Sequence, residues 1–316
     1  MGTMDRRTWL TATAATLGGA VASHAEATKD DKPDSKKAEP FRFGLNTATL
    51  MGQKLSIVEV VEVAARAGYR DIEPWVRELD RYVESGGKLK DLQKRIADRG
   101  LSVPSAIDFF EWIVDDETQR KKGLENARRG MDAVKQIGGT RIAAPPSGAT
   151  NRGNIPLSTI AQRYRALLDI GSEIGVVPQV EVWGFSKTLS RLSEAAYIAV
   201  ESGHKDACIL ADVYHLYKGG SGFGGIHALN GSALHVLHMN DYPADPPRDA
   251  IADAQRVYPG DGVAPLKTFL RDLCHIGFRG TLSLELFNRD YWKRDALTVA
   301  RSGLDKMRAV VASSLE

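Results

Sequence analysis

The sequence has few cysteines, almost no net charge and no apolar run long enough to cross a membrane. Its 316 residues include 2 cysteines, which are too few for a disulfide scaffold. Lysine and arginine number 42 against 40 aspartate and glutamate. This balance argues against a dedicated nucleic-acid-binding protein, whose domain is usually strongly basic. What remains is a globular protein with enough chain to bury a large core.

The amino-terminal segment has the features of a targeting signal rather than of a folded domain. Arg6 and Arg7 precede a mildly apolar run over residues 10–22, and small residues follow at Ala25 and Ala27. At this length the run is too short to span a bilayer. The pattern resembles a twin-arginine (Tat) export signal, with an amphipathic segment as the alternative. The resemblance implies transit through the Tat translocase, a periplasmic or otherwise exported location, and no stable membrane span after cleavage.

Composition divides the chain into three parts. We expect a Tat-type signal peptide over residues 1–27 and a charged linker without apolar periodicity over residues 28–40. Residues 41–316 then form a single folded domain of about 276 residues, close to the ~250 residues typical of a (β/α)₈ barrel.

Short β-prone runs alternate with helical patterns through this domain, which favours parallel βα units and an α/β (β/α)₈ TIM barrel. The eight predicted strands are Phe41–Asn46, Tyr69–Glu73, Ser102–Ile107, Arg141–Ala144, Pro178–Trp183, Ala207–Val213, Ala233–Asn240 and Gly280–Leu286. The predicted helices are Ile57–Ala67, Leu89–Arg99, Thr118–Ile137, Ser158–Ile174, Leu189–Ser202, Ile226–Leu229, Pro265–Ile276 and Trp292–Ala312. A doubly wound Rossmann sheet is disfavoured because no strand is followed by a GxGxxG turn.

Cys208 and Cys274 fall on elements that are not expected to be neighbours, so we predict free thiols.

Four successive predicted strands end in groups that can bind a metal. Glu181, Asp212, His238 and Glu285 lie at equivalent positions on the fifth to eighth strands, where a barrel gathers its catalytic groups. Three carboxylates buried together without a counter-charge would be unfavourable, and a divalent cation removes that objection. The donor set suits Mn²⁺ first, with Mg²⁺, Co²⁺ or Zn²⁺ as alternatives.

These motifs make the sequence similar to a known family. Glu181 in VEVWG, Asp212 and His215 in DVYH, His238 in LHMND and Glu285 in LSLEL resemble the xylose-isomerase-like TIM-barrel superfamily of sugar phosphate isomerases and epimerases. The resemblance covers residues 41–313. It assigns the four metal ligands to the same positions and places a substrate-oxygen histidine at His215. Family members form dimers and tetramers, so a homo-oligomer stays open.

The resemblance implies proton transfer next to a carbonyl through an enediolate, with a small sugar or oxidised sugar as substrate. Glu181 and Glu285 are the catalytic candidates that move the carbon-bound proton, and His215 is the candidate that binds a substrate oxygen. Lys187 stands where the family's epimerases carry a glutamate. Further substrate-binding candidates are Trp183, Lys187, Arg256, and Asn46 and Glu73 at the ends of the first two strands.

Three functions share this site. The first is a divalent-metal-dependent sugar isomerase or epimerase. The second is a keto-sugar or keto-glycoside lyase or dehydratase, because elimination begins with the same deprotonation. The third is a non-catalytic carbohydrate-binding barrel, which has no need of two glutamates at a metal. A DNA-repair activity of the kind found in endonuclease IV is disfavoured, since the second and third strands end without the additional histidines that its zinc site requires.

Overall fold

The computed structural model describes residues 40–316; the twin-arginine segment and most of the charged linker lie outside this range. Seven strands form one sheet in the order β2-β1-β7-β6-β5-β4-β3, and all neighbours are parallel. The strands are β1 (Arg42–Asn46), β2 (Asp71–Glu73), β3 (Arg141–Ala144), β4 (Val177–Glu181), β5 (Ile209–Asp212), β6 (Leu234–Met239) and β7 (Thr281–Leu284).

An irregular segment fills the gap between β2 and β3, where the sequence predicted a regular strand over Ser102–Ile107. The Ile72 amide donates to the Ser102 carbonyl at 2.9 Å, and the Ala143 amide donates to the Ala106 carbonyl at 2.8 Å. The segment thus bonds to both sheet edges and closes the barrel as its eighth member. Pro104 lies in its middle and has no N–H to donate, so a continuous ladder cannot form here. The strand prediction is corrected accordingly, while the barrel is confirmed.

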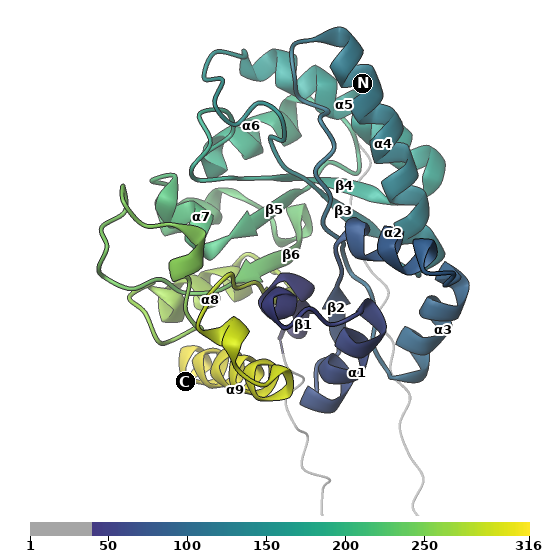
Figure 1. Ribbon diagram of the computed structural model, residues 1–316. Helices are drawn as coiled ribbons and strands as arrows, with labels where there is room; N and C mark the ends of the chain where they lie inside the picture. The colour runs from purple at the N-terminus through teal and green to yellow at the C-terminus, as the bar shows by residue number, and fades with distance from the viewer. Residues whose placement is uncertain (1–39) are drawn as a thin grey trace, which may run out of the picture. The chain divides into compact units, whose positions relative to one another are not determined.

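Helices surround the strands (Figure 1). They are α1 (Ile57–Ala67), α2 (Val76–Glu84), α3 (Leu89–Asp98), α4 (Glu117–Gln136), α5 (Leu157–Ile174), α6 (Leu192–Glu201), α7 (Val213–Lys218), α8 (Leu266–His275) and α9 (Ala296–Leu315). Among residues 40–316, no helix combines the length and apolarity needed to cross a membrane. Cys208 and Cys274 are both free thiols, as predicted.

Local sequence explains where the helices begin and end. Ser56 accepts from the Glu59 amide and the Glu59 carboxylate accepts from the Ser56 amide, a capping box that starts α1. Gly68 ends the same helix with φ 99°, a left-handed conformation that glycine adopts without steric cost. The sequence did not predict α2 or α7. Val76 and Leu79 are the buried residues of α2, and their three-residue spacing was the signal available for finding this helix.

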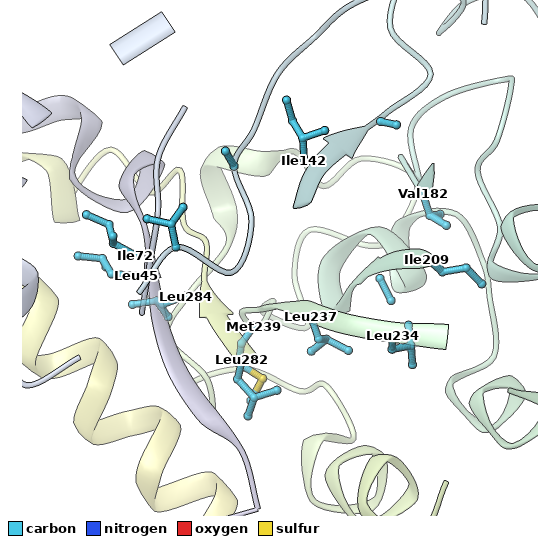
Figure 2. Close-up of a cluster of buried hydrophobic side chains, with 14 of the residues drawn as sticks. Leu45, Ile72, Ile142, Val182, Ile209, Leu234, Leu237, Met239, Leu282 and Leu284 are labelled. Carbon is cyan, nitrogen blue, oxygen red and sulfur yellow. The ribbon is translucent and has the colours of Figure 1, made fainter. Parts of the chain in front are cut away.

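The apolar side chains form two clusters on opposite sides of the strands. The larger one lies between strands and helices, and Figure 2 shows part of it, including Leu45, Ile72, Ile142, Val182, Ile209, Leu234, Leu237, Met239, Leu282 and Leu284. A small second cluster, with Ala143, Leu210 and Val236, occupies the alternate positions of the same strands. These alternate positions point into the barrel, and towards the carboxyl ends of the strands they become polar.

Candidate metal centre

The structure brings together the four residues that the sequence predicted as metal ligands. Glu181 ends β4, Asp212 ends β5, His238 lies in β6 and Glu285 directly follows β7. All four are buried. Asp212 is paired with His238 in the parallel register, so the two side chains leave the sheet side by side. Potential ligand atoms of Asp212, His238 and Glu285 lie within 4.8 Å of one another.

The His238 imidazole is the centre of the group. Its Nδ1 lies 3.3 Å from Glu285 Oε2, 3.6 Å from Asp212 Oδ2 and 3.8 Å from Glu181 Oε1. Both imidazole nitrogens of His238 and Glu181 Oε2 are buried without a hydrogen-bond partner. An unpartnered Nδ1 surrounded by three carboxylates is consistent with a group that shares a cation with them.

Electrostatics lead to the same conclusion. Burial raises the pKa of the Glu181 carboxyl to about 8, and the carboxylates of Glu285 and Asp212 add to the effect. Although burial opposes it, Glu285 and Glu73 raise the pKa of His238 well above its usual value. The site therefore favours positive charge at its centre. Three carboxylates and one imidazole fit a divalent cation, which binds the deprotonated forms of such groups.

A second layer of hydrogen bonds orients the donors. The Asp212 carboxylate caps α7 by accepting from the His215 amide at 2.8 Å, and Asn240 Nδ2 donates to its other oxygen at 3.2 Å. On the far side of the imidazole, Glu73 Oε2 lies 3.2 Å from His238 Nε2. The same Glu73 oxygen accepts from the side chains of Asn46 at 3.0 Å and Ser283 at 2.7 Å. This arrangement leaves the opposite nitrogen, Nδ1, facing the carboxylates.

Arg256 joins the centre from the long loop after β6. Its Nη1 donates to Asp212 Oδ2 at 2.8 Å and to Glu285 Oε2 at 2.9 Å, while Nη2 lies 3.1 Å from His215 Nε2. Its guanidinium also packs over the ring of Tyr214, 4.5 Å from the centroid. Despite burial, Arg256 holds the pKa of Asp212 well below its usual range. The sequence predicted Arg256 as a substrate contact, and the structure adds this ionic role at the metal ligands.

A pocket of about 290 Å³ opens over the centre. Of the predicted site residues, five line it: Trp183, Glu181, His215, Arg256 and Glu285. Burial lowers the pKa of His215. The remaining lining residues are Trp75, Ile107, Phe109, Phe185, Asp253, Ala254, Phe287, Arg289 and Trp292.

Three predicted substrate-binding residues lie elsewhere. Asn46 and Glu73 are fully buried behind the ligands and do not line the pocket, so their contacts are with Glu285 and His238 rather than with the cavity. Lys187 is exposed on the turn after β4 and also lies outside the lining.

Most of the pocket's aromatic residues were not among the sequence's site candidates. Trp75 lies two residues after β2, Phe109 two residues after the irregular segment 102–107, and Phe287 three residues after β7. Residues just after the carboxyl ends of the strands lie at the mouth of a barrel, and this placement was the signal from which the three aromatic residues could have been predicted.

A parallel barrel with buried carboxylates and a histidine at the carboxyl ends of its strands defines a TIM barrel with a candidate metal site. The family model described as xylose isomerase-like TIM barrel matches residues 61–310, and the chain belongs to this family.

Curated relatives include both isomerases and dehydratases. An inosose isomerase from Bacillus velezensis is 25% identical over 279 residues, covering 86% of this chain and 98% of the relative. A 3-dehydroshikimate dehydratase from Pseudomonas aeruginosa is 24% identical over 267 residues, or 84% of this chain and 40% of that longer protein. Among solved structures, the IolI protein with a bound zinc atom matches with a TM-score of 0.80 and 22% identity, covering 87% of this chain and 99% of IolI.

Proposed function

We propose that this protein is a divalent-metal-dependent isomerase or epimerase that moves a proton on the carbon next to the ketone of a sugar or a cyclic polyol. The observation that carries the proposal is the position of Glu181 and Glu285. Glu285 belongs to the Asp212–His238–Glu285 group, Glu181 Oε1 lies 3.8 Å from His238 Nδ1, and both carboxylates line the pocket. The similarity to inosose isomerase supports a cyclic polyol ketone as the type of substrate.

The residues of the chain have different roles in the proton transfer. One carboxylate, Glu181 or Glu285, takes the proton from carbon while the C–H electron pair moves into the carbonyl group. A bound divalent cation supplies Lewis-acid stabilisation of the negative charge on the substrate oxygens. The other carboxylate returns a proton. Return to the former carbonyl carbon completes an isomerisation, and return to the opposite face of the same carbon completes an epimerisation.

His215 and Arg256 hold the oxygen side of the substrate. The His215 imidazole is buried at the pocket wall, and its Nδ1 has no hydrogen-bond partner. It is placed to bind a hydroxyl and to carry its proton between oxygens during isomerisation. Arg256 Nη1 binds Asp212 and Glu285 together, which keeps Glu285 turned towards the pocket floor.

With Glu181 counted beside Asp212, His238 and Glu285, the donor set of three carboxylates and one imidazole favours Mn²⁺ as the resident ion, although the similar IolI structure holds zinc. Metal analysis of the purified protein decides between them. We expect one divalent ion per chain, loss of activity on removal by a chelator, and recovery when Mn²⁺ is added. A protein that binds no divalent ion and whose activity ignores chelators contradicts the proposal.

Deuterium exchange tests the proton transfer directly. Inososes and free keto-sugars are incubated in D₂O with the metal-loaded protein, and loss of the proton next to the ketone is followed by NMR. Glu181→Gln and Glu285→Gln should each slow the exchange by about 10²- to 10⁴-fold, as expected for a lost acid–base group. The matched control is Glu84→Gln, an exposed residue at the end of α2. Exchange in Glu285→Gln within tenfold of the wild-type rate contradicts the assignment.

A dehydratase is the second candidate. Elimination of a hydroxyl β to the ketone starts with the same deprotonation and then needs an acid that protonates the departing oxygen. His215 occupies a position in the pocket wall that suits this role, and the similarity to 3-dehydroshikimate dehydratase supports it. In the NMR experiment, the appearance of an alkene proton signal distinguishes elimination from isomerisation.

A further inference from the structure

The pocket above the metal centre has one aromatic side. Ring centroids form a continuous series, with Phe287 to Trp75 at 6.2 Å, Trp75 to Phe109 at 4.9 Å, Phe109 to Trp183 at 5.7 Å and Trp183 to Phe185 at 5.3 Å. Four different connections contribute these rings: those after β7, after β2, after the segment 102–107 and after β4. We call this series the aromatic wall.

The aromatic wall becomes more exposed towards the mouth of the pocket. Trp75, near its deep end, is 7% exposed, whereas Phe109 is 36% and Phe185 is 44% exposed. The two phenylalanines are among the few large apolar residues that residues 40–316 leave open to solvent, and both line the pocket. A contiguous apolar surface at a pocket mouth is typical of a binding site.

The backbone that carries Phe185 is fixed, and its ring stacks on Trp183 with 5.3 Å between the centroids. The turn that carries it is closed at both ends, by the Trp183 amide donating to the Leu189 carbonyl at 3.1 Å and the Ser186 amide donating to the Trp183 carbonyl at 2.8 Å. A Cβ on Gly184 would lie 2.3 Å from the His215 carbonyl oxygen, so this glycine packs directly against α7. A fixed backbone reduces the conformational entropy that the turn loses when a ligand binds.

The lining also carries charged residues, Asp253, Arg256 and Arg289. The Arg256 guanidinium is bound to Asp212, Glu285 and Asp253, and it lies 5.0 Å from the centroid of Phe287 at one end of the aromatic wall. A ligand that matches this lining presents the flat, apolar face of a ring to the aromatic wall and hydroxyl groups to the charged residues.

We propose that Phe109 and Phe185 form a second ring subsite, and that the substrate is a glycoside-like ketone with two rings. The keto ring lies over Glu181 and Glu285, and the second ring stacks on the exposed phenylalanines. This proposal rests on the proposed function for the identity of the first ring. A keto ring without an appended group uses the deep part of the pocket and leaves the exposed rings of the wall unused.

Binding measurements test the subsite without requiring turnover. The metal-loaded protein is titrated calorimetrically with three unreactive probes: methyl β-D-glucopyranoside, which has one ring, and phenyl β-D-glucopyranoside and methyl β-cellobioside, which have two. Stacking on an aromatic side chain should strengthen binding of a two-ring probe about tenfold over the methyl glucoside. Tighter binding of the phenyl glucoside indicates that the second ring is aromatic. Tighter binding of methyl β-cellobioside indicates that the second ring is a sugar.

Variants locate the effect. Phe185→Ala and Phe109→Ala should remove the advantage of the two-ring probes, and Phe185→Leu, which keeps apolar volume and protects folding, should reduce it. The control is Tyr197→Ala, an aromatic residue of α6 that is 42% exposed and lies outside the pocket lining. This variant should keep the advantage. Equal binding of the one-ring and two-ring probes, or an advantage that survives in both alanine variants, overturns the subsite.

The outcome is separable from that of the proposed function. If the two-ring advantage is found but no ketone exchanges deuterium, the subsite stands and the isomerase fails. If one-ring ketones exchange deuterium but the probes bind equally, the isomerase stands and the subsite fails.

Discussion

Replacing Asp241 by asparagine should destabilise the protein severely, because its carboxylate connects the end of β6 to the loop that carries Arg256. The side chain is buried. Its Oδ1 accepts from the amides of Tyr242 at 2.8 Å and Ala264 at 2.9 Å, and its Oδ2 accepts from those of Gly260 at 3.0 Å and Gly262 at 3.1 Å. Four backbone donors therefore depend on two oxygens.

An asparagine at this position keeps one oxygen and turns an NH₂ group towards two backbone N–H donors. Two hydrogen bonds to a charged group are lost, each worth about 1.5–3 kcal/mol, which gives a loss of about 3–6 kcal/mol. That is a large part of the 5–15 kcal/mol that typically stabilises a domain. The backbone of Asp241 is also paired with Val257, so the position of Arg256 depends on the same connection.

Urea unfolding followed by circular dichroism measures this effect. The control is Asp249→Asn in the same loop, whose side chain is 91% exposed and whose replacement should change stability by no more than about 0.5 kcal/mol. Asp241→Asn should also lower the rate of deuterium exchange, because Arg256 contacts Asp212 and Glu285. A loss of stability below about 1 kcal/mol in Asp241→Asn would refute the reasoning that the four amides depend on the carboxylate.

Three further predictions concern other groups. Burial raises the pKa of Asp108 to about 6. Since the folded pKa exceeds the unfolded value, this carboxyl costs stability as pH rises from about 4 to 6, and the cost stays constant above that range. Asp108→Asn should therefore stabilise the protein by up to about 3 kcal/mol at pH 7.5 and by little at pH 4; equal thermal stability at pH 7.5 contradicts this. Glu73→Gln removes the charge beside His238 Nε2 and should weaken metal binding by about 10- to 100-fold in chelator competition, whereas unchanged affinity rejects the positioning role. Finally, lysine at both Arg6 and Arg7 should keep the full-length chain in the cytoplasm of a Gram-negative host; fractionation showing undiminished export would argue against a Tat signal.

The clustering of the four candidate metal ligands could be predicted because it follows from strand direction. In parallel strands the carboxyl ends meet at the same end of the barrel, so Glu181, Asp212, His238 and Glu285 had to converge once the strands were located. Period-two alternation then assigned each side chain to the inner face. The helix α1 was equally accessible, because a capping box and a glycine mark its two ends within the local sequence.

Contacts made by loops could not be read in the same way. Lys187 was chosen by its spacing from Glu181, but the tight turn after β4 leaves it exposed outside the pocket and places Phe185 at the mouth instead. Glu73 was chosen as a strand-end residue facing substrate, and the short β2 keeps it behind His238. Pro104 was a visible warning against a regular third strand, yet the segment still closes the barrel through isolated hydrogen bonds.

The sequence by itself therefore determined the barrel and the identity of the four convergent donors, because periodicity and strand direction are local properties of the chain. Only the tertiary structure decided what surrounds them. Arg256 reaches Asp212 across 44 positions of sequence, and the rings of Phe109 and Phe185 come from different loops. Such contacts depend on how irregular segments pack against one another, and no repeating pattern in the sequence encodes that packing.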